Sequence, residues 1–302
     1  MPNFSFTDLF LVCGCTIVVA FLLSIIVDWG LEFFCAEHDK PFFSYGYANH
    51  NGPHTWRNYY PECDGKNQSP INLMTKKALV VNDSDDLLWF NYHIPPSCIK
   101  IFNDGQTVLV RAQWPEALWP TIICGPLNEQ YGFHTILFRW GPEDEEGSEH
   151  TVDNRSYAME LQMVHVKKGF TTPLSAIRSG AKDGLVIVSF LFKLMPVDNP
   201  LLDRVVYNLW RITSPGSNVT IPAFPLNWFF EPFCSNYYTY NGSLTHPPCS
   251  ESVLWIIQPE ALAISSRQLA EFRKLMSHDG RMTSNSRPVQ KNSQDVYFYS
   301  SN

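Results

Sequence analysis

The stretch Leu137-Phe138-Arg139-Trp140-Gly141 is followed at some distance by Glu160-Leu161-Gln162-Met163-Val164-His165. Both stretches are typical of buried β-strands, in which side chains two positions apart share one face. Leu137 and Arg139 therefore point to the same side, and so do Glu160 and Gln162. If the two strands are neighbours, a cation, an amide and a carboxylate meet at one place.

Further short motifs occur in a fixed order between Tyr45 and Pro288. They are Tyr47-Ala48-Asn49-His50-Asn51-Gly52-Pro53, Asn67-Gln68-Ser69-Pro70-Ile71-Asn72-Leu73, Asn103-Asp104-Gly105-Gln106, Gly147-Ser148-Glu149-His150, Tyr240-Asn241-Gly242-Ser243-Leu244-Thr245-His246-Pro247-Pro248-Cys249 and Asn285-Ser286-Arg287-Pro288. Together with the two strands, these motifs resemble the α-carbonic anhydrase family. The resemblance implies a mostly β (α+β) domain with a large central twisted mixed sheet, small peripheral helices and a site in a cone-shaped cavity.

The local sequence pattern agrees with a mostly β domain. Runs rich in β-branched and aromatic residues alternate with Gly, Pro, Asn and Asp turns, at 99–102, 107–110, 135–140, 159–166 and 185–191. The clearest helical pattern covers 265–276, where Leu269, Phe272 and Leu275 can share one face.

The resembled family binds zinc through three histidines, and none of them is present here. The resemblance places Leu137, Arg139 and Gln162 at the three ligand positions, and Gln106 at the position of the proton-shuttling histidine. Leucine and arginine do not ligate zinc, an amide is a poor zinc ligand, and glutamine does not titrate. We therefore expect no zinc cofactor, and we predict a pseudoenzyme, that is, a chain that is not an enzyme.

Three groups around the family's metal position are retained. Glu149 and Thr245 stand where the family orients the zinc-bound hydroxide, and Glu160 stands where a carboxylate holds the third histidine. Buried carboxylates without a partner are costly. Our hypothesis is that Arg139 fills the zinc position and pairs with Glu149 or Glu160, while Gln162 completes the hydrogen bonds.

Two other interpretations remain open. Arg139 could bind a small anion or carboxylate, for which a guanidinium is suited. His134 and His246 could line the cavity mouth and form a displaced metal site, which would support residual or altered carbonate dehydratase or esterase-type activity. His165 belongs to the opposite face of its strand, so we predict a packing role for it.

The N-terminus predicts a membrane anchor. We divide the chain into a short tail (1–8), a transmembrane signal anchor (9–28), a linker (29–44) and the carbonic anhydrase-like domain (45–302). The uncharged run Leu9–Val27 would span roughly 28 Å as a helix, which fits a bilayer. A cleaved signal peptide is the alternative, but such peptides usually carry basic residues, and none precedes Lys40.

The cysteines and glycosylation sequons predict an extracellular or lumenal domain. Cys63 and Cys249 match the positions where the resembled family's secreted and membrane-bound members carry a disulfide, which needs an oxidising compartment. The pairing of Cys35, Cys98, Cys124 and Cys234 stays undetermined. Sequons at Asn82, Asn154 and Asn218 favour glycosylation, whereas those at Asn67 and Asn241 lie within family motifs.

The composition of the chain argues against one class of binding partner. The chain has 29 acidic and 22 basic residues and no basic run, which argues against nucleic-acid binding. Taken together, these observations predict a single-pass, type II membrane protein whose extracytoplasmic domain acts as a binding or interaction module for another protein. The sequence does not identify this partner.

Overall fold

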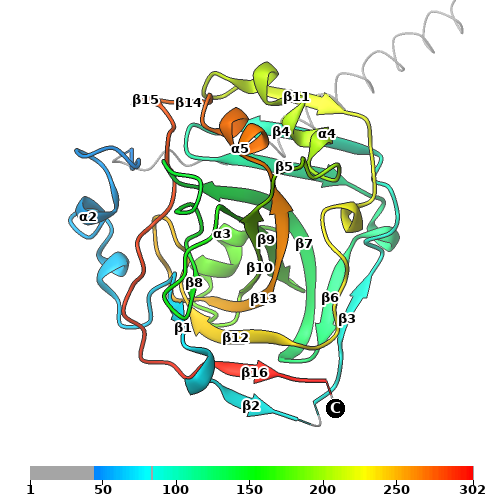
Figure 1. Ribbon diagram of the computed structural model, residues 1–302. Helices are drawn as coiled ribbons and strands as arrows, with labels where there is room; N and C mark the ends of the chain where they lie inside the picture. Colours follow the sequence, from blue (N-terminus) through cyan, green and yellow to red (C-terminus); the bar gives the residue numbers. More distant parts are fainter. Residues whose placement is uncertain (1–43, 83, 302) are drawn as a thin grey trace, which may run out of the picture. The chain divides into compact units, whose positions relative to one another are not determined.

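A computed structural model describes residues 44–82 and 84–301. Within them, most strands join one twisted 12-stranded sheet (Figure 1). Its strands are β2 (Leu79–Val81), β3 (Leu87–Phe90), β4 (Cys98–Asn103), β5 (Val108–Gln113), β6 (Thr121–Cys124), β7 (Leu127–Trp140), β9 (Met159–Lys167), β10 (Leu185–Leu194), β11 (Asn218–Ile221), β12 (Tyr237–Gly242), β13 (Val253–Ile264) and β16 (Tyr297–Tyr299). Two small two-stranded sheets pair β1 (Asn72–Leu73) with β8 (Thr151–Val152), and β14 (Met276–Ser277) with β15 (Gly280–Arg281).

The strand order of the large sheet is β11-β4-β5-β7-β9-β10-β13-β12-β16-β2, while β6 also pairs with β7 and β3 pairs with β6. Strands β10 and β13 are parallel, as are β16 and β2, whereas the other neighbours are antiparallel. The sheet is therefore mixed, as expected from the sequence.

The helices are short. They are α2 (Pro53–Trp56), α3 (Pro173–Arg178), α4 (Asp203–Val206) and α5 (Ser266–Phe272), with 3₁₀ turns η1 (Pro61–Asp64), η2 (Thr75–Lys77), η3 (Glu116–Leu118), η4 (Leu209–Ile212) and η5 (Leu226–Trp228). Helix α5 begins with a capping box formed by Ser265 and Gln268. It ends at Phe272, earlier than the sequence pattern predicted, and Met276 already belongs to β14.

The central strands are buried on both faces, which separates two apolar clusters. On β7, Ile136 and Phe138 belong to the larger cluster, whereas Leu137 belongs to the smaller one. The same alternation on β10 puts Val188 in the larger cluster and Ile187 in the smaller one. The side chains of the candidate site lie on the face of the smaller cluster, because Arg139 shares the face of Leu137.

Candidate functional site

Strands β7 and β9 bring the four residues singled out in the sequence together. Leu137 lies opposite Gln162, and Arg139 lies opposite Glu160, in an antiparallel pairing. All four side chains are buried, and Arg139 is only 1% exposed. The site is therefore a polar cluster enclosed by protein.

Arg139 is paired with Glu149. Its Nε atom lies 3.5 Å from Glu149 Oε2, an ion-pair contact. Its Nη1 atom donates to the Tyr47 hydroxyl at 2.8 Å and to the Asn285 carbonyl oxygen at 3.3 Å. Burial opposes the charge of Arg139, but the Glu149 carboxylate and other neighbouring groups outweigh this and raise the pKa of Arg139 above its usual range. The cluster thus holds a permanent cation.

Gln162 bridges the two buried carboxylates. Its Nε2 atom donates to Glu149 Oε2 at 2.7 Å and to Glu160 Oε1 at 2.9 Å. Both hydrogens of the amide are used, so the side chain has one favourable orientation. The expected role of Gln162 in completing the hydrogen bonds is what the structure shows.

Glu160 is held by His150 and not by Arg139. Its Oε2 atom accepts from the backbone N–H groups of Glu149 and His150, at 2.9 and 2.8 Å. Its Oε1 atom accepts from His150 Nδ1 and from the Ser189 hydroxyl, both at 2.9 Å. Burial would raise the pKa of Glu160, but the His150 interactions outweigh it and lower the pKa to about 2.

The pKa of Glu149 is shifted in the opposite direction to that of Glu160. Burial raises its pKa above the ordinary value, although Arg139 and the Thr245 hydroxyl act in the opposite direction. Its Oε1 atom accepts from the backbone N–H of Arg287 at 3.0 Å. Gln162 and Arg139 also present a donor and a positive charge to this carboxylate, which opposes the effect of burial.

The remaining predicted site residues lie around this cluster. Gln106 lines a cavity of about 310 Å³ next to Tyr47, and its Nε2 atom donates to the Tyr45 carbonyl oxygen at 2.5 Å. The His246 ring stacks on Tyr45, with 6.2 Å between ring centroids. Burial and the nearby Arg111 lower the pKa of His134 to about 4. His246 thus packs against Tyr45, whereas His134 is buried near Arg111.

His165 has the packing role that its strand position predicted. It is completely buried, and its Nε2 atom lies 2.5 Å from the Tyr92 hydroxyl. Burial lowers its pKa to about 3, so the ring is neutral at physiological pH.

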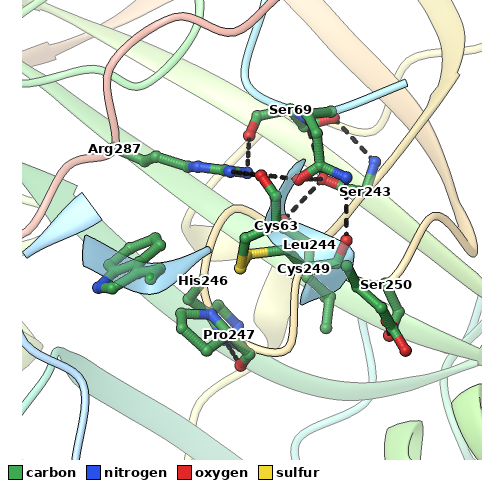
Figure 2. The surroundings of a disulfide bond; sticks show 12 residues. Cys63, Ser69, Ser243, Leu244, His246, Pro247, Cys249, Ser250 and Arg287 are labelled. Carbon is green, nitrogen blue, oxygen red and sulfur yellow. Dashed lines mark hydrogen bonds between the residues drawn. A yellow bond between two sulfur atoms is a disulfide. The ribbon is translucent and has the colours of Figure 1, made fainter. Parts of the chain in front are cut away.

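The Cys63–Cys249 disulfide is present and is tied to the site by Arg287 (Figure 2). Arg287 Nη2 donates to the Cys63 carbonyl oxygen at 3.1 Å, and Nη1 donates to the Ser69 carbonyl oxygen at 2.8 Å. Among the described cysteines, Cys98, Cys124 and Cys234 are free thiols. Cys35 lies outside the described residues.

Sequence reasoning did not assign roles to Tyr47, Asn285, Arg287 and His150. All four lie within the motifs that resemble the family, and this was the only sign in the sequence that they could have a role. Tyr47 and Asn285 contact Arg139 from 92 and 146 residues away, and strand periodicity gives no access to such contacts.

These residues do not fit a zinc ion. The three side chains that the resemblance assigns to the zinc-ligand positions are an alkyl group, a guanidinium and an amide that donates to two carboxylates. A second cation beside Arg139 would be repelled, and zinc prefers thiolate, imidazole and carboxylate ligands. Across residues 44–82 and 84–301, no group of three or more His, Cys, Asp or Glu side chains could hold a metal ion.

The fold and the ordered motifs define a carbonic anhydrase domain. The family model for eukaryotic-type carbonic anhydrase matches residues 51–300, and the chain belongs to this family. It is similar to carbonic anhydrase 3 of Sus scrofa, with 35% identity over 234 residues, which cover 77% of this chain and 87% of the relative. Carbonic anhydrase 3 of Mus musculus is 35% identical over 237 residues, and that of Homo sapiens is 33% identical over 234 residues, with the same coverage.

The comparisons correct one prediction. From the lost zinc ligands we predicted that the chain is not an enzyme. This is contradicted by the family match and by the relatives, because both carry the name of an enzyme across most of the chain. The side chains at three positions do not by themselves determine the activity of a whole domain.

The predicted anchor at 9–28 lies outside the described residues. Within the described part, no helix is long and apolar enough to cross a membrane.

Proposed function

We propose that this chain is a membrane-tethered member of the carbonic anhydrase family, whose extracytoplasmic domain serves as a binding module for a protein partner and holds no zinc at the family's metal position. One observation carries the proposal. The guanidinium of Arg139, a residue that the resemblance assigns to a zinc-ligand position, is buried with Glu149 as its counter-ion, 3.5 Å away. The carboxylates that would support a metal site are committed to this pair and to His150.

Three features support the location. The Cys63–Cys249 disulfide is stable in an oxidising compartment. The Asn82, Asn154 and Asn218 side chains are all exposed, as N-glycosylation requires. The uncharged run Leu9–Val27 has the length of a transmembrane helix. A signal anchor at 9–28 with the domain on its C-terminal side gives the type II orientation.

Family membership favours a second candidate function, carbonate dehydratase activity. The supporting observation is the 33–35% identity with carbonic anhydrase 3 over 77% of the chain. Such activity would have to use groups other than Leu137, Arg139 and Gln162 as metal ligands. An anion site at Arg139 is less favoured, because this guanidinium is 1% exposed and already bonded to Tyr47 and Asn285.

The test measures zinc content and carbon dioxide hydration on the purified full chain. A matched variant, L137H/R139H/Q162H, restores histidine at the three positions. We expect the wild type to contain far less than one zinc per chain and the variant to approach one. A wild type with nearly one tightly held zinc would overturn the zinc-free proposal, and metal-dependent hydration of carbon dioxide by the wild type would favour the second candidate.

The tether needs a separate experiment. Sealed microsomes that contain the full chain are divided into two portions: one is washed with alkaline carbonate, and the other, still sealed, is treated with protease. We expect the chain to stay with the membrane and the domain to be protected. Release by carbonate would contradict the anchor, and digestion of the domain without detergent would contradict the lumenal orientation.

A further inference from the structure

Within the described residues, three strands of the large sheet have a neighbour on one side only: β11, β2 and β3. The outer side of β3 is covered, because Leu87 N–H donates to the Cys234 carbonyl oxygen at 3.0 Å and the Trp89 indole donates to the Phe233 carbonyl oxygen at 2.7 Å. The other two strands, β11 and β2, end the main strand order at opposite sides of the sheet (Figure 1).

Open edges of this kind favour pairing with another chain, because they present unpaired backbone donors and acceptors. Strand β2 adds apolar side chains, since Leu79 is 48% exposed and Val80 is 61% exposed. Strand β11 carries Asn218 and Thr220 on its exposed face, with Val219 and Ile221 buried beneath them. Neither strand contains proline or a charged residue, the usual devices that protect an edge.

Both edges carry a glycosylation sequon. Asn218 is the first residue of β11, and the required hydroxyl residue, Thr220, lies on the same exposed face. Asn82 directly follows β2, and its hydroxyl residue is Ser84. Asn82 Oδ1 accepts from the Ser300 hydroxyl at 2.6 Å, which leaves its Nδ2 atom for the sugar. A sugar on Asn82 Nδ2 would therefore leave the hydrogen bond from Ser300, the residue after β16, intact.

The two sequons within family motifs differ. Asn67 Nδ2 donates to Glu251 Oε2 at 3.3 Å, so its attachment atom is engaged. The hydroxyl residues of the two sequons, Ser69 and Ser243, are completely buried. The exposed Asn154 offers a comparison, because it lies in the turn after β8, a strand that pairs with β1 and does not belong to the large sheet.

We propose that N-linked glycans at Asn218 and Asn82 cover the two open edges of the sheet and keep the domain from pairing edge to edge with a second copy. This inference rests on the proposed extracytoplasmic location, where glycosylation takes place. A hydrated, branched oligosaccharide is much wider than the roughly 4.8 Å spacing between strands. A strand of another molecule could not approach an edge that carries one.

The experiment uses the full chain made in animal cells and purified in detergent. Glycans are counted by mass before and after enzymatic removal, and self-association is measured by sedimentation velocity. Thr220→Ala and Ser84→Ala should each remove one glycan. The double variant should self-associate about tenfold more strongly than wild type.

Conservative variants serve as controls. Thr220→Ser and Ser84→Thr keep their sequons and should stay glycosylated and monomeric. Ser156→Ala removes the sequon of Asn154 and should not change self-association. Wild type made in animal cells that keep N-glycans in the high-mannose form can be trimmed to single sugars by endoglycosidase H after folding. This second measurement does not depend on folding of the double variant, and trimming should also promote association.

The outcomes separate this inference from the proposed function. A chain without any glycan would contradict the extracytoplasmic location and the inference together. A glycan at Asn154 with none at Asn82 and Asn218 would leave the location standing and refute the inference. Occupied edges whose removal or trimming leaves the protein as monomeric as Ser156→Ala would refute the protective role.

Discussion

Arg139 and Glu149 form an ion pair across 3.5 Å, with their side chains 2% and 0% exposed. Removal of one partner from such a pair leaves an uncompensated buried charge. We expect Arg139→Met, which roughly keeps the side-chain volume, to lower the free energy of unfolding by about 3–5 kcal/mol. Urea denaturation of the full chain at pH 7 measures this.

A double-mutant cycle provides the control. Arg139→Met combined with Glu149→Gln removes both charges, so the pair of substitutions should cost less than the sum of the two single ones. Strict additivity would show that the two side chains do not stabilise each other.

The Gln162 amide donates hydrogen bonds to two carboxylates, so a substitution that removes the donor should destabilise the fold. In Gln162→Glu a third carboxylate would face Glu149 and Glu160, which now accept at 2.7 and 2.9 Å. We expect a loss of about 3 kcal/mol or more, measured as the free energy of unfolding, and a larger loss at pH 8 than at pH 5, because the new carboxyl ionises as pH rises. Gln162→Leu is the uncharged control, and its loss should not grow between these pH values. Equal effects of Glu and Leu would contradict the bridging role.

The β-strands and the facing of Leu137, Arg139 and Gln162 could be predicted from the sequence because strand periodicity is local. The sequence did not show whether Arg139 pairs with Glu149 or with Glu160. That choice depends on His150, whose ring and backbone N–H both bind Glu160 and so leave Glu149 for the guanidinium. Such a contact arises from a loop conformation and has no periodic signal. For the same reason, the end of helix α5 at Phe272 was missed, since β14 and β15 form there through tertiary packing.

The Cys63–Cys249 disulfide closes a loop with a sequence separation of 186 residues. On the chain-entropy model, a loop of this size stabilises the folded state by up to about 5 kcal/mol. We expect Cys63→Ser/Cys249→Ser to unfold at a lower urea concentration than wild type and to become insensitive to reductant. Cys234→Ser, at an exposed free thiol, should behave as wild type. A wild type whose midpoint is unchanged by reductant would contradict the prediction.

The buried imidazole of His165 should make the stability of the domain depend on pH. Burial lowers its pKa to about 3 in the folded protein, whereas an unfolded chain returns it to about 6.5. Between these values the unfolded chain binds more protons, so the free energy of unfolding falls as pH falls, by up to about 1.4 kcal/mol per pH unit. His134, with a pKa lowered to about 4, acts in the same direction. Glu149 acts in the opposite direction, because its pKa is raised, and Glu160 contributes only below its ordinary value of 4.5.

The contribution of His165 can be isolated with His165→Gln, which keeps a hydrogen-bonding group for the Tyr92 hydroxyl but does not titrate. The variant should be less stable than wild type at pH 7, because an amide fills the ring's place poorly. Between pH 6 and pH 5, however, its free energy of unfolding should fall less steeply, with a slope smaller by up to one proton. Urea denaturation at half-unit pH steps measures both effects. Parallel curves for the two proteins would mean that His165 has the same proton affinity in the folded and unfolded chains, which its complete burial argues against.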